Sequence, residues 1–159
     1  MKKEQIQEYT RKVAEASRSG LVVITYDIIM SELQNAREYE ENREEAQMVK
    51  SLKSAQRFVT NLMGSLDYHY AISLELLSLY RYVNQVLVTS IVKKNTEGLS
   101  GAEDVLQKLR EAFDGVSKQD HSGAVMQNTQ RVVAGLTYGR GQLTETCLGK
   151  GDENRGIIA

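Results

Sequence analysis

The chain contains no proline, and this absence restricts its possible folds more than any other feature of the sequence. Only five of its 12 glycines precede residue 120. Because proline and glycine interrupt helices most strongly, long stretches without them favour long helices. The other seven glycines fall within the last 39 residues. We therefore predict a boundary between a helical domain, residues 1–120, and a C-terminal extension, residues 121–159.

Apolar residues recur every three or four positions through residues 1–120, which is the spacing of amphipathic helices. This spacing predicts a short helix near the N-terminus and four longer helices over about 19–39, 44–66, 70–93 and 100–116. With short connections and no strand pattern, the expected fold is all-α: an antiparallel up-and-down four-helix bundle with a short N-terminal capping helix on its outside. The 70–93 segment is apolar on more than one face, so we expect it to be the central helix.

Two further patterns concern the C-terminal part of the chain. Ser100 and Glu103 have the spacing of a capping box, in which both side chains bond to free backbone N–H groups at the start of a helix. A stripe of apolar residues over 121–135 predicts a short amphipathic helix in the glycine-rich extension, followed by a loop. This extension is either a mobile appendage, or a segment that covers a groove of the bundle or contacts a partner.

Charge and cysteine content exclude several classes of function. The 20 Lys and Arg residues are balanced by 21 Asp and Glu, and no long basic run occurs, so nucleic-acid binding is not expected. The N-terminus lacks the apolar stretch of a secretory signal, and polar residues interrupt the most apolar segment, so we expect no stable membrane insertion. A single cysteine, Cys147, fits a reducing compartment. The expected location is the cytoplasm.

The sequence contains no pattern typical of a catalytic or metal site. His69 and His121 have no Cys, Asp, Glu or second His at metal-ligand spacing, and we interpret His69 as an ordinary loop residue. Cys147 has no neighbouring base, and the Gly149–Gly151 segment does not match a phosphate-binding loop. We therefore predict a protein that is not an enzyme, with no catalytic residue, metal or cofactor.

Apolar residues exceed what a four-helix core of this size requires. Residues 21–30 are apolar on nearly every side, and so is the 70–92 segment. Such a surplus predicts an exposed apolar groove, a common mark of an interaction site. Alternatively, the N-terminal segment and the extension cover this surface.

Five short blocks occur in order along the chain. They are ASRSGL at 16–21, TYD at 25–27, KSAQ at 53–56, SLD at 65–67 and LYRYV at 79–83. Together they resemble the FliS family of flagellin export chaperones, over about residues 5–118. Two positions depart from the family pattern: Arg18 stands where proline is usual, and Thr25 stands where leucine is usual.

The resemblance implies a fold and a partner. Members of this family are antiparallel helical bundles that bind the disordered C-terminal segment of flagellin in the cytosol. They prevent its premature polymerisation and deliver it to the flagellar type III export apparatus. The implied partner is thus a flagellin C-terminal segment, bound 1:1, and further partners would be export-gate components or a flagellar regulator. Physically, the flagellin segment would fold on the apolar groove as short amphipathic helices.

The resemblance also suggests roles for individual residues. Tyr9 would belong to a movable N-terminal cap, anchored by Ile6 and Val13. Asp27 and Asp67 would either cap helices or bond to flagellin backbone, and we favour capping. Nine side chains are the candidates for the flagellin-binding groove: Tyr26, Ile28, Ala55, Val59, Leu62, Leu66, Leu79, Tyr80 and Val83.

A different class of protein is also compatible with the sequence. A cytosolic helical adaptor, or an oligomerisation module, would use the same apolar groove to bind a regulatory protein or a second copy of itself. Self-association would distinguish this alternative, because a groove buried in a homodimer is not free for a flagellin peptide.

Overall fold

A computed structural model describes residues 1–125, which form five α-helices and, within that range, no strand. The predicted all-α class is confirmed. The part of the predicted extension helix that lies in residues 121–125 is not helical, and the rest of it falls outside the described residues. In chain order the helices are α1 (Lys3–Glu15), α2 (Arg18–Glu41), α3 (Glu45–Gly64), α4 (Ile72–Lys93) and α5 (Ser100–Gln119).

Local chemistry explains where α2 begins. The Ser17 hydroxyl accepts a hydrogen bond from the Gly20 amide at 3.2 Å, which satisfies one of the free N–H groups of the first turn. Arg18 is therefore the first helical residue. The first helical residue needs no N–H donor, which is why proline is tolerated there. Arginine also fits this position, so the departure from the family pattern leaves the start of the helix intact.

The predicted capping box at Ser100 and Glu103 is wrong. Ser100 already belongs to α5, Leu99 occupies the capping position, and no side chain caps this helix. The Glu103 carboxylate instead accepts two hydrogen bonds from the Arg37 guanidinium on α2, at 3.0 and 2.7 Å. In this bidentate pair both partners are charged, whereas in a capping box only the carboxylate is charged, and the pair joins two helices.

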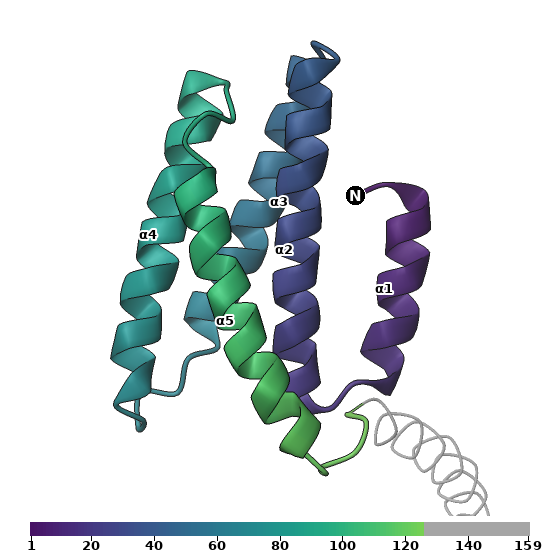
Figure 1. The fold of residues 1–159 in the computed structure, drawn as a ribbon, viewed down its shortest axis with the longest axis vertical. Helices are drawn as coiled ribbons and strands as arrows, with labels where there is room; N and C mark the ends of the chain where they lie inside the picture. Colours follow the sequence, from purple (N-terminus) through teal and green to yellow (C-terminus); the bar gives the residue numbers. More distant parts are fainter. Residues whose placement is uncertain (126–159) are drawn as a thin grey trace, which may run out of the picture.

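The four long helices pack in a ring. Helix α2 contacts α3 and α5, and α4 contacts the same two helices from the opposite side. In Figure 1 the chain runs up along α2, down along α3, up along α4 and down along α5. Among the helices that the structure describes, α1 packs on α2 alone, on the outside of the ring.

The expectation that the 70–93 segment is the central helix is wrong, because α2 holds that position. Nine residues of α2 are buried, compared with six residues of α4. The reason is that α2 is covered by three helices, α1, α3 and α5, whereas among the described elements α4 is covered only by α3 and α5.

The core joins all four long helices through one cluster of buried side chains. It includes Leu33 of α2, Leu52 of α3, Val83 of α4 and Leu106 of α5. Aromatic rings lie within it: the Tyr26 ring packs against Phe113 of α5, with ring centroids 5.8 Å apart.

Candidate protein-binding surface

Helix α1 lies on α2 mainly through polar contacts. The Gln5 amide donates to the Ser31 hydroxyl at 2.8 Å, and its oxygen accepts a bond from Asn35 at 3.0 Å. The Tyr9 hydroxyl donates to the backbone oxygen of Asp27 at 3.2 Å. No residue of α1 is buried. Water can replace such contacts far more easily than it can replace an apolar core, so α1 is held on α2 by exchangeable bonds.

Two ion pairs hold the first turn of α1. The α-ammonium of Met1 lies 3.0 and 3.1 Å from the two carboxylate oxygens of Glu32, which is 0% exposed. The Lys2 ammonium lies 2.5 Å from the Glu38 carboxylate. Their hydrogen bond raises the pKa of Lys2 and lowers the pKa of Glu38. Both carboxylates belong to α2, and both positive partners come from the N-terminal end of the chain.

The three predicted cap residues differ in how far their side chains are buried. Tyr9 is half-buried, and this burial raises the pKa of its phenol. Val13 is half-buried as well. Ile6 is 47% exposed, so polar bonds rather than this side chain hold the helix in place.

Asp27 does not cap a helix, although capping was the favoured prediction. It lies in the middle of α2, where its carboxylate receives a bond from the Arg110 guanidinium of α5 at 2.5 Å. This bond raises the pKa of Arg110. Asp27 thus links α2 to α5 through its side chain and to α1 through its backbone oxygen. Asp67 follows α3 and accepts a bond from the His69 amide at 3.0 Å, and this contact, with the bond from the His69 ring, lowers its pKa.

The predicted groove residues divide into core and periphery. Five of them form part of the core in this structure, with exposed fractions of 0 or 1%: Tyr26, Ala55, Val59, Tyr80 and Val83. Ile28 and Leu62 are buried at 7 and 6% exposure, and Leu66 is half-buried. Leu79, at 38%, is the one exposed member of the predicted set.

Helix α4 carries an apolar surface that the predicted set missed. Leu74, Val88 and Val92 are 63, 39 and 75% exposed. Leu74 and Val92 are 18 residues apart, about five helical turns, so they lie on one line along the helix, with the exposed Arg81 and Gln85 between them. We call these three residues the outer face of α4. The sequence carries a signal for it, because the 70–92 segment is apolar on nearly every side, and this surplus predicts an exposed apolar surface as well as central burial.

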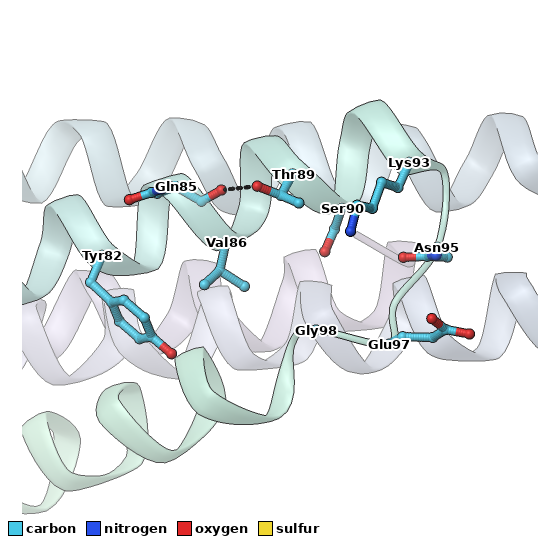
Figure 2. A pocket seen from close by; sticks show the side chains of 9 residues that line it. All are labelled: Tyr82, Gln85, Val86, Thr89, Ser90, Lys93, Asn95, Glu97 and Gly98. Atoms are coloured by element: carbon cyan, nitrogen blue, oxygen red, sulfur yellow. Dashed lines mark hydrogen bonds between the residues drawn. The ribbon is translucent and has the colours of Figure 1, made fainter.

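A pocket of about 420 Å³ adjoins α4 on the side facing α5. Figure 2 shows the Tyr82 ring reaching from α4 toward the first turn of α5, while Lys93 and Asn95 lie at the other end of the pocket. Gly101 permits this approach, because a Cβ atom there would lie 2.5 Å from the Tyr82 hydroxyl. Polar groups line much of the remainder, including Gln85, Thr89, Ser90 and Glu97.

The described part of the chain contains no arrangement that resembles a metal centre or a membrane span. Within residues 1–125, no three His, Cys, Asp or Glu side chains gather where they could hold a metal ion. None of the helices in this range is both long enough and apolar enough to cross a bilayer.

Residues 1–120 match the model of a chaperone family of the flagellar export system, and this family is not a class of enzymes. The matching family is described as Flagellar protein FliS, and the chain belongs to the FliS family. The resemblance carried by the five sequence blocks is thereby confirmed. Among curated proteins, none matches the chain significantly.

Proposed function

We propose that this protein is a cytosolic export chaperone that binds the disordered C-terminal segment of flagellin one to one. It prevents premature polymerisation and delivers flagellin to the flagellar type III export apparatus. The observation that carries this proposal is the family match over residues 1–120. The up-and-down four-helix arrangement, with residues 1–120 as the flagellin-binding domain, is part of the proposal.

In this proposal the outer face of α4 receives one amphipathic helix of flagellin. Leu74 and Val92 have exposed fractions of 63 and 75%, and no other described element packs over them. A disordered segment that folds on such a strip buries apolar area on both partners, which offsets part of the ordering entropy. Leu79 and Tyr82 are 38 and 45% exposed on the same helix, and Tyr82 also lines the pocket between α4 and α5.

The second part of the surface lies around α1, which would leave α2 when flagellin binds. Ile28, Leu62 and Leu66 would then contribute edges of the groove, while the five core members of the predicted set would support its floor from inside. Release of α1 breaks mainly hydrogen bonds and ion pairs, and its residues are not part of the core. Replacement of α1 by flagellin would therefore leave the core intact.

Titration calorimetry with a synthetic flagellin C-terminal segment from the same organism tests the proposal, with light scattering on the mixture. We expect a 1:1 complex and a clearly negative heat-capacity change, because coupled folding on an apolar surface buries apolar area. Absence of binding, together with self-association of the free protein, would favour the alternative of an adaptor that binds a regulatory protein or its own copy.

Variants of α4 test which surface is used. Leu74→Ser and Val92→Ser should together weaken flagellin binding about tenfold or more, since each removes an exposed apolar contact. Val116→Ser is the matched control, because Val116 is an exposed apolar residue, 58% accessible, on α5. Equal losses in the α4 variant and the control would contradict the role of the outer face.

Export-gate components or a flagellar regulator are further partners in this proposal, and pull-down with the complex tests them.

A further inference from the structure

The chain after α5 folds back onto the turn between α1 and α2 (Figure 1). One carboxylate oxygen of Asp120 accepts bonds from the Ser19 hydroxyl and from the Ser19 amide, the latter at 3.4 Å. Its other oxygen accepts a bond from the Ser122 amide at 3.0 Å. Asp120 thus joins the end of α5 to the first turn of α2. These hydrogen bonds hold the pKa of Asp120 well below its usual range.

A second bond reaches the residue that follows α1. The Val125 amide donates to the backbone oxygen of Ala16 at 3.1 Å. Ala16 is the residue that ends α1, and the next residue, Ser17, caps α2. The short turn between the two helices is therefore bonded to the chain that follows α5.

Close packing adds to these bonds at the same end of the bundle. A Cβ atom on Gly20 would lie 3.2 Å from the Ser17 hydroxyl oxygen and 3.5 Å from that of Ser117. The last part of α5 therefore lies directly against the first turn of α2. Any shift of residues 120–125 changes the surroundings of the turn from which α1 departs. The Val125 contact lies beyond residue 120, where the family match ends.

We propose that residues 120–125 form a clasp that fixes the α1–α2 turn and thereby keeps α1 docked on α2. Because α1 has no buried residue, its docking depends on being presented to α2 in the right orientation. A fixed turn supplies this orientation and raises the effective concentration of α1 at its binding surface. The clasp couples the segment after α5 to the release of α1. The importance of the clasp for flagellin binding rests on the proposed function, but its effect on the docking of α1 does not.

Hydrogen exchange of the full-length protein, with mass-spectrometric detection and without flagellin, tests the clasp. In Asp120→Ala and in Ser19→Ala, α1 amides should exchange about threefold to tenfold faster, while amides of α3 and α4 keep their wild-type rates. The double variant should add little to Asp120→Ala, because both single changes remove the same contact. Asp114→Ala is the matched control, because it removes a carboxylate of α5 that pairs with Lys118 of the same helix.

The bond to α1 has its own pair of variants. Val125→Pro removes the amide donor, and Val125→Ala keeps it, so only the proline variant should accelerate exchange in α1. Unchanged α1 exchange in both Asp120→Ala and Val125→Pro would overturn the proposal. Equal acceleration in all five helices would also overturn it, since that result means general destabilisation. Neither outcome depends on flagellin, so failure of the clasp is distinguishable from failure of the proposed function.

Discussion

At the scale of single residues, the most informative contact is the pair of buried tyrosines. Tyr26 of α2 and Tyr80 of α4 are 0 and 1% exposed, and their hydroxyl oxygens lie 2.5 Å apart. Burial raises the pKa of both phenols. One hydroxyl donates to the other across the bundle, so each of the two buried oxygens has a hydrogen-bond partner in the core.

Removal of one hydroxyl should cost more than removal of both. Tyr26→Phe leaves the Tyr80 hydroxyl without its partner, and we expect a loss of about 1–2 kcal/mol in the free energy of unfolding. Tyr26→Phe combined with Tyr80→Phe should recover part of this loss. Urea unfolding followed by circular dichroism measures both effects, with the exposed Tyr82→Phe as control. A double variant as unstable as the sum of the single variants would refute the pairing.

The raised pKa of Tyr26 also predicts how stability changes at alkaline pH. Its unfolded value is about 10, and burial favours the neutral phenol, so the folded protein binds this proton more tightly than the unfolded chain. Its contribution to stability is complete below pH 10 or so and is lost as the pH rises further. In an ultraviolet titration, the exposed tyrosines should ionise first, and a second step should coincide with loss of helical signal. Complete tyrosine ionisation in a protein that is still helical would contradict this prediction.

At the scale of helices, α1 and α4 have opposite characters. Helix α1 is short and is bonded to α2 by polar side chains, whereas α4 is part of the bundle and exposes apolar side chains outward. In the proposed function, α1 would leave α2 and α4 would receive the partner.

Fixing α1 in place should block the part of binding that needs its release. Gln5 and Ser31 are in direct contact, so Gln5→Cys and Ser31→Cys can be joined by a short thiol cross-linker in a Cys147→Ser background. We expect the cross-linked protein to bind the flagellin segment at least about tenfold more weakly, because α1 then competes permanently. The same double variant without cross-linker is the control. Equal affinity in both states would show that α1 stays docked in the complex.

At the scale of the whole molecule, the packing predicts an order of local opening. Hydrogen exchange in the wild-type protein should be fastest in α1, which contacts one helix, and slowest in α2, which contacts three. Helices with more buried contacts open only in larger unfolding events. Protection of α1 equal to that of α2 would mean that α1 belongs to the cooperative core.

The sequence predicted the elements well and their surroundings poorly. Helical spacing and the lack of proline are local signals, and they sufficed for the all-α class and for the bounds of α3 and α4 to within a few residues. Burial depends on which helices lie next to each other. For this reason Tyr26 and Tyr80 were expected at a groove although they lie in the core, and α4 was expected at the centre although α2 occupies it.

Contacts between segments that are distant in the sequence could not be predicted either. Glu103 has the right spacing to cap its own helix, but the fold brings Arg37 to it from α2. The Ser19 hydroxyl donates to Asp120, and the Val125 amide donates to Ala16; both bonds join residues about a hundred positions apart, and no local pattern signals them.

The two ion pairs at the start of α1 have a consequence for the charge of the opened protein. If α1 leaves α2, as we propose, Glu32 and Glu38 would stay on α2 while the ammonium groups of Met1 and Lys2 would depart with α1. Opening would therefore uncover two acidic side chains that are paired in the closed form. A segment carrying lysine or arginine would be drawn to α2 only after the cap has gone, and added salt would weaken that attraction. A more positively charged ligand would then bind the open state more tightly and so shift the equilibrium further toward that state.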